Sequence, residues 1–153
     1  MFDDLNELYQ EVILHHSKSP SNFRKLDDAN RSAEGNNPVC GDRFTIFMKI
    51  DGDVIRDISF QGSGCAISKA SASMMTEALR GKSVGEAQKF FQEFQEMIKT
   101  GVAEKIDSTK LGVFAGVHKF PMRVKCAILP WHAMMASLKG DQKLVSTEEE
   151  SNN

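Results

Sequence analysis

Three cysteines are the residues of this sequence best suited to chemistry, and they stand far apart at Cys40, Cys65 and Cys126. Asp42 follows Cys40 with only Gly41 between them. Thiolates and carboxylates are zinc ligands, and a thiolate is also a nucleophile. Because three cysteines cannot all pair within one chain, the sequence favours metal binding or thiol chemistry over a disulfide framework.

The spacing alone leaves two interpretations open. There is no Cys-x-x-Cys pair, and a free cysteine often serves as a small buried apolar residue. Asp42, in turn, has the ordinary interpretation of a turn residue. The alternative is a shared site, in which three thiolates and one carboxylate bind zinc tetrahedrally and keep a net negative charge.

The elements around the first two cysteines predict how they meet. Alternating apolar residues from Phe44 to Met48, a turn at Asp51–Asp53 and a second alternating run from Val54 to Gln61 predict a β-hairpin. Cys40 precedes the first strand and Cys65 follows the second, so both are expected at the same end of the sheet.

The backbone at each cysteine supports such a site. Gly41 allows a tight turn and leaves room for a ligand. In an extended chain Cys40 and Asp42 would point to the same side. Cys65 follows Gly64 at the start of a predicted helix, where the helix dipole stabilises a thiolate. Cys126 lies on the last predicted helix, which must fold back to close the site.

The remaining periodicity predicts mostly helices, with a polar segment before the hairpin that is mainly loop with one weak edge strand. Helices are expected at 3–17, 65–81, 83–101 (capped by Ser83 and Glu86), shortly before Pro121, and at 122–140 with a kink or break at Pro130. This order predicts an α+β fold, with helices packed on a small antiparallel sheet of three strands, one of them weak. Residues 1–140 form the expected single domain, and 141–153 a disordered tail.

Composition excludes several classes of partner. The 153 residues carry a formal charge of −2, which provides no attraction for nucleic acid or an anionic membrane surface. The acidic start lacks the basic and apolar regions of a signal peptide, and no apolar run approaches the length of a membrane span. A cytoplasmic location is therefore expected.

The cysteine motifs "NPVCGD", "GSGCAIS" and "RVKCAILPW" closely resemble those of the NifU/IscU-like iron–sulfur cluster assembly family, and the resemblance extends from about Leu5 to Met135. IscU scaffolds carry histidine directly before the third cysteine, where this chain has Lys125. The connection between Cys65 and Cys126 is also longer than in those scaffolds. Both features resemble the SufU branch of zinc-containing sulfur-transfer proteins.

The resemblance implies a SufE/NifU-type fold and zinc ligated by Cys40, Asp42, Cys65 and Cys126. It also implies that Cys40 accepts persulfide sulfur from a SufS-type, pyridoxal-phosphate-dependent cysteine desulfurase, for delivery to a downstream Suf cluster-assembly scaffold. Two alternatives remain: a scaffold that holds iron or a [2Fe–2S] cluster on the same residues, and an adaptor whose zinc is only structural.

The charged residues near the third cysteine have two interpretations. Arg123 and Lys125 are either surface charges on a helix or groups that bind the partner and stabilise a persulfide. Among the histidines, His15 and His16 are expected on the solvated end of the first helix. His118 and His132 are minor candidates for a metal ligand.

Overall fold

The computed structural model describes residues 2–103, 111–140 and 144–146, and side chains from residue 10 to residue 140 within those ranges. In chain order the elements are α1 (Phe2–Lys18), β1 (Arg31–Asn37), β2 (Asp42–Asp51), β3 (Val54–Ser63), α2 (Ala66–Leu79), α3 (Val84–Thr100), the 3₁₀ helix η1 (Leu111–Lys119), α4 (Pro121–Leu138) and β4 (Leu144–Ser146).

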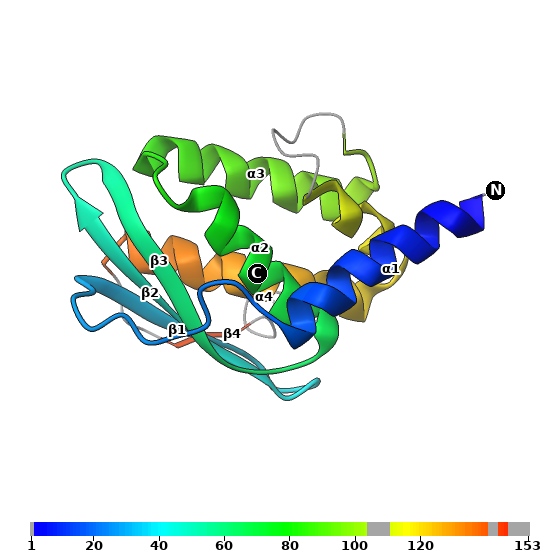
Figure 1. Cartoon of the computed structure of the whole chain (residues 1–153), viewed down its shortest axis with the longest axis horizontal. Helices are drawn as coiled ribbons and strands as arrows, with labels where there is room; N and C mark the ends of the chain where they lie inside the picture. Colours follow the sequence, from blue (N-terminus) through cyan, green and yellow to red (C-terminus); the bar gives the residue numbers. More distant parts are fainter. Residues whose placement is uncertain (1, 104–110, 141–143, 147–153) are drawn as a thin grey trace.

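The strands form one sheet in the order β3-β2-β1-β4 (Figure 1). β2 pairs antiparallel with β3 on one side and with β1 on the other, so the predicted hairpin and the additional strand before it are confirmed, although β1 is not at the edge of the sheet. β4 adds parallel to β1 through Leu144–Ser146. The predicted tail thus contains a short strand, because β1 has an open edge, while residues 141–143 and 147–153 lie outside the described residues.

The helices cover one face of the sheet (Figure 1). α4 packs on β1 and β2, α2 packs on β3 and α4, and α1 packs on α2. The alternating residues Phe44, Ile46 and Met48 of β2 point into this layer and are fully buried. The predicted α+β architecture is therefore confirmed, and its core lies between the sheet and α2 and α4.

α3 begins with the predicted capping box. Glu86 N–H donates to the Ser83 side chain and Ser83 N–H donates to the Glu86 carboxylate. Gly101 ends the helix with a left-handed φ of 81°.

In the described part of the chain, no helix is long and apolar enough to cross a membrane.

α4 runs through Pro130 without a break, so of the predicted kink or break, the break is wrong. A proline inside a helix removes one backbone donor, here the one that would serve the Cys126 carbonyl. The Ser71 hydroxyl of α2 donates to the neighbouring Ala127 carbonyl at 2.6 Å and accepts from Trp131 Nε1 at 3.1 Å. Trp131 also stacks on Phe94, with ring centroids 4.5 Å apart. Packing against α2 and α3 therefore holds α4 across the proline.

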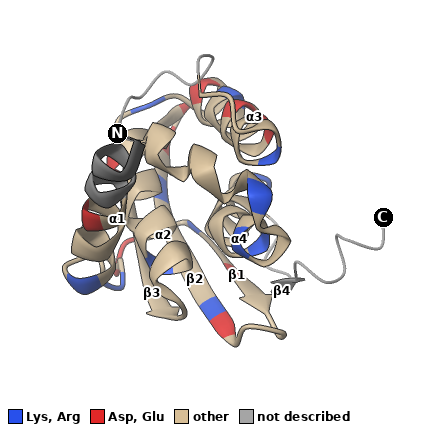
Figure 2. Cartoon of the chain, turned by 90° about the vertical axis from the view of Figure 1, so that its right-hand side faces the viewer, with Lys and Arg blue, Asp and Glu red and all other residues tan. Residues whose placement is uncertain are grey.

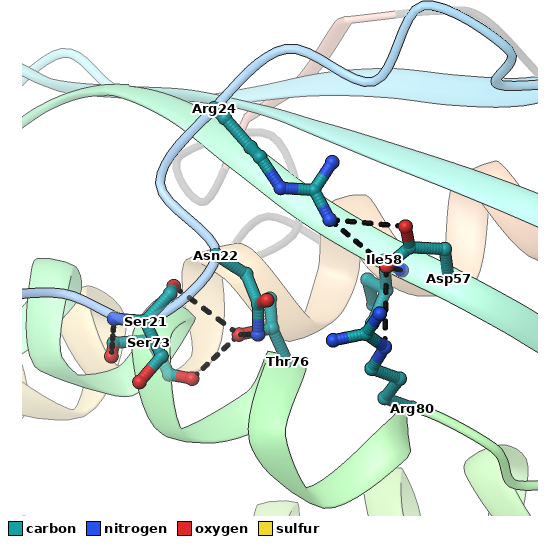
Figure 3. A network of polar contacts seen from close by, with 8 residues as sticks. All are labelled: Ser21, Asn22, Arg24, Asp57, Ile58, Ser73, Thr76 and Arg80. Atoms are coloured by element: carbon teal, nitrogen blue, oxygen red, sulfur yellow. Dashed lines mark hydrogen bonds and ion pairs between the residues drawn. The ribbon is translucent and has the colours of Figure 1, made fainter.

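Hydrogen bonds and ion pairs connect the segment after α1, from Ser21 to Arg24, with α2 and β3 (Figure 3). Ser21 N–H donates to Ser73 Oγ at 2.8 Å, and Asn22 Nδ2 donates to Thr76 Oγ1 at 3.0 Å. Arg24 from this segment and Arg80 from the end of α2 both pair with Asp57. The loop closes over the outer strand β3, where Phe23 forms a bridge to Phe60.

The expected position of His16 is wrong. Its ring is buried rather than solvated, and Nδ1 lies 2.7 Å from Ser73 Oγ. The neighbouring His15 is exposed, as predicted. The physical reason is that α1 packs against α2, which turns one of two adjacent histidines inward.

His132 makes stability depend on pH. Burial, with a smaller contribution from the charge of Lys99, lowers the pKa of His132 to about 4. In the unfolded chain the pKa is about 6.5, so between these values only the unfolded chain binds the proton, and stability falls as the pH falls. The loss should reach on the order of 3 kcal/mol near pH 4.

We expect His132→Gln to lose less stability than the unmodified chain between pH 7 and pH 4.5, because its amide does not titrate. Urea unfolding at a series of pH values measures this difference. Parallel pH dependences in the two proteins would contradict the assignment.

Candidate metal centre

Cys40 lies on the turn that joins β1 to β2 and is exposed. Gly41 adopts a left-handed φ of 77°, and its N–H donates to the Asn37 carbonyl at 2.8 Å. The predicted glycine turn is therefore present. The extended geometry expected for Cys40 and Asp42 is wrong, because the turn, rather than strand alternation, brings the two side chains together.

Asp42 opens β2 and is buried, with 1% of its surface exposed. Its Oδ1 accepts a hydrogen bond from Cys65 N–H at 2.8 Å. Its Oδ2 is buried and has no hydrogen-bond partner among the described residues. A buried carboxylate oxygen without a donor is costly unless a cation or another donor satisfies it.

Gly64 makes room for this carboxylate. A Cβ at Gly64 would lie 2.5 Å from Asp42 Oδ1, 2.6 Å from Ser68 Oγ and 2.9 Å from a ring carbon of Phe44. These distances are shorter than any ordinary contact, so a side chain there would displace the Asp42 carboxylate.

Cys65 is the N-cap of α2, and its sulfur accepts from Ser68 N–H at 3.4 Å. A hydrogen bond with the Cys126 thiol is the main cause that lowers the pKa of Cys65 to about 6, with support from Ser68 and against the effect of burial. The predicted placement of a cysteine at a helix N-terminus, where a thiolate is favoured, is thus confirmed.

Cys126 comes from the second turn of α4 and is buried. Its thiol lies 3.8 Å from Cys40 Sγ. The hydrogen bond to Cys65, together with burial and the nearby Asp42, raises the pKa of the Cys126 thiol above its usual range. The shifts of the two thiols have opposite directions because Cys65 and Cys126 share one hydrogen bond.

The structure brings the ligand atoms of Cys40, Asp42 and Cys126 within 4.8 Å of one another. The Cys65 sulfur is outside that group of three, although it hydrogen-bonds with Cys126. Two sulfurs bound at about 2.3 Å to a tetrahedral zinc lie about 3.8 Å apart, which is the observed Cys40–Cys126 separation. This spacing, the unpaired Asp42 Oδ2 and the sulfur-rich donor set fit zinc.

Arg123 and Lys125 lie on the first turns of α4, which carries no acidic residue (Figure 2). Arg123 is exposed and stands three residues before Cys126, with its guanidinium 4.3 Å from the centre of the Phe120 ring. Lys125 is half-buried. Both belong to the same end of α4 as Cys126.

The two candidate histidines are not part of the group formed by Cys40, Asp42 and Cys126 in the described residues. His118 Nδ1 lies 3.0 Å from the Ala115 carbonyl. His132 packs edge-on against Phe91, on the side of α4 that faces α3.

Sequence reasoning missed Ser68, which is fully buried. Its N–H bonds to the Cys65 sulfur, and its hydroxyl lies 3.5 Å from that sulfur and donates to the Cys65 carbonyl. The signal was present, because Ser68 stands at the third helical position after an N-cap, where a backbone N–H meets the capping side chain.

We expect Gly64→Ala to lower zinc affinity roughly tenfold or more, because the added methyl group displaces Asp42. Competition with a chromophoric chelator measures the affinity. Gly116→Ala is the control, because a Cβ there meets nothing within 4 Å. Equal zinc affinity in both variants would show that Asp42 does not depend on Gly64.

Comparisons with known proteins identify the family of this chain. The family model "NifU-like N terminal domain" matches residues 8–127. The zinc-dependent sulfurtransferase SufU of Bacillus subtilis strain 168 is 43% identical over 132 residues, which cover 86% of this chain and 89% of that protein. The iron–sulfur cluster assembly scaffold protein IscU of Streptococcus pyogenes serotype M1 is 44% identical over 138 residues, which cover 88% and 85%.

A solved structure is also similar. The crystal structure of FiSufU from Fervidobacterium islandicum AW-1 has a TM-score of 0.75 at 37% identity and covers 87% of this chain and 98% of that chain. The resemblance noted from the three cysteine motifs is confirmed, and the chain belongs to the NifU-like N-terminal domain family of iron–sulfur cluster assembly proteins.

Proposed function

We propose that this protein is a zinc-dependent sulfurtransferase that carries sulfur on Cys40. It takes the sulfur from a cysteine desulfurase and passes it to the iron–sulfur cluster assembly machinery. The observation that carries the proposal is the contrast in exposure at the site. Cys40 is exposed on a turn, whereas Asp42 and Cys126 beside it are buried. The similarity to a zinc-dependent sulfurtransferase of Bacillus subtilis supports the same activity.

Cys40, Asp42, Cys65 and Cys126 are the residues that would hold the zinc. When bound, zinc would keep the thiolates deprotonated at neutral pH. The protein prepares for this at Cys65, where the hydrogen bond with the Cys126 thiol, supported by Ser68 at the N-cap, lowers the pKa to about 6. Asp42 contributes the oxygen Oδ2, which no described residue uses.

Cys40 is the residue placed to react. Its thiolate would attack the outer sulfur of a cysteine persulfide on the desulfurase, which forms a new sulfur–sulfur bond on Cys40 and breaks the one on the donor. The donor cysteine leaves as a thiolate, so electrons and atoms balance without an added oxidant or reductant. Because Cys40 is on a turn, its side chain can move without disturbing a helix or strand.

A SufS-type, pyridoxal-phosphate-dependent cysteine desulfurase is the proposed donor, and a Suf cluster-assembly scaffold is the proposed acceptor. The surface beside the site suits a protein partner. Val39 next to Cys40 is 63% exposed, and Phe120 and Met122 near Arg123 are also exposed. Arg123 supplies positive charge there for the partner or for an anionic persulfide.

Single cysteine variants test which thiol accepts the sulfur. After incubation with desulfurase and cysteine, we expect a mass gain of one sulfur atom on the unmodified chain and none on Cys40→Ala. Cys65→Ala and Cys126→Ala keep the acceptor and serve as matched controls for the loss of a zinc ligand. An equal sulfur adduct on Cys40→Ala would overturn the assignment of Cys40.

Metal content separates this function from that of a cluster scaffold. We expect protein purified without added metal to contain about one zinc per chain and no visible chromophore. Zinc analysis and an absorption spectrum measure both. Stable iron with the absorption of a [2Fe–2S] cluster would instead support the scaffold function.

A further inference from the structure

Asn37, the last residue of β1, has an amide that the fold itself does not use. Its side chain is fully buried, yet neither Oδ1 nor Nδ2 has a hydrogen-bond partner among the described residues. Buried amides are almost always hydrogen-bonded, because each unpaired atom costs roughly 1–3 kcal/mol. The turn after β1 does not need this amide, since the Asn37 backbone carbonyl already accepts the Gly41 N–H.

The position of Asn37 connects it to the metal centre. It is the register partner of Asp42 in the β1–β2 pair, and directly opposed residues of antiparallel strands point to the same face. Both side chains are buried on the face that α4 covers. Asp42 Oδ2 is also unpaired, so three unsatisfied polar atoms gather on this face at one end of the sheet.

We propose that Asn37 is a positioning residue of the metal centre. Its Nδ2, which makes no hydrogen bond to Asp42 in this structure, would donate to the Asp42 carboxylate when a metal is bound and orient it toward the metal. The inference rests on the proposed zinc site. Metal-ligating carboxylates are themselves hydrogen-bonded in metal sites, and these outer contacts set metal affinity. A neutral amide suits the position because it donates without adding charge to an anionic set of ligands.

The test is the zinc affinity of Asn37→Leu, measured by chelator competition together with the thermal stability of the metal-free protein. We expect affinity to fall about 10- to 100-fold, because the carboxylate loses its donor. The stability of the metal-free protein should stay equal or rise, because an unpaired buried amide is removed. The visible bands of the cobalt-substituted protein should shift, because the geometry around the metal changes.

Asn37→Asp is the second variant. The aspartate side chain has nearly the same shape as asparagine but no hydrogen-bond donor when it is ionised, so this variant should also bind zinc more weakly. Matched controls are Asn36→Leu and Asn36→Asp. Asn36 lies on the opposite face of β1 and pairs with the exposed Arg43, so both controls should bind zinc normally.

The outcomes separate this inference from the proposed function. If both Asn37 variants keep the zinc affinity and the cobalt spectrum of the unmodified chain, the role of Asn37 is overturned. The proposed zinc site would still stand in that case, because the unmodified chain binds zinc normally. A metal-free protein that is destabilised without any change in affinity would likewise assign Asn37 a structural role only. Failure of the unmodified chain to bind zinc would overturn the proposed function and this inference with it.

Discussion

The hydrogen bond from Cys65 N–H to Asp42 Oδ1 is the contact on which the site depends. It ties the first residue of β2 to the N-terminus of α2, two positions that are 23 residues apart in the chain. Two features allow it. The β2–β3 pairing brings both positions to the same end of the sheet, and the absence of a side chain at Gly64 lets the carboxylate approach the helix. Cys65 thus caps α2 with its sulfur and orients a proposed metal ligand with its backbone N–H.

The third cysteine depends on a different set of contacts. Cys126 reaches the site only because α4 lies across β1 and β2, and α4 is held there by side chains far from the metal centre. Trp131 stacks on Phe94 and donates a hydrogen bond to Ser71, and Ser71 also donates to the Ala127 carbonyl in the turn before Pro130. Core packing therefore positions the buried half of the site, whereas a local turn positions Cys40.

This division has a chemical consequence. Asp42 and Cys126 are buried side by side and keep a ligand geometry ready, while the exposed turn lets Cys40 face a partner. Buried unpaired atoms at Asp42 and Asn37 show that the site is not satisfied by protein contacts alone in the described residues. Proteins tolerate such groups where function requires them, because satisfying them internally would remove the capacity to bind.

Local signals in the sequence determined much of the fold and the identity of the site. Strand alternation around Ile46, the turn at Gly52 and the capping box of Ser83 and Glu86 depend on near neighbours, so the sequence alone predicted them. The three cysteine motifs predicted the family in the same way. The continuity of α4 through Pro130, the burial of His16 and the addition of β4 depend on contacts between distant segments, and local periodicity does not report such contacts. Only the tertiary structure decided that Asn37 lies beside Asp42, because strand register sets that neighbour, and that the Cys65 sulfur stays outside the group formed by Cys40, Asp42 and Cys126.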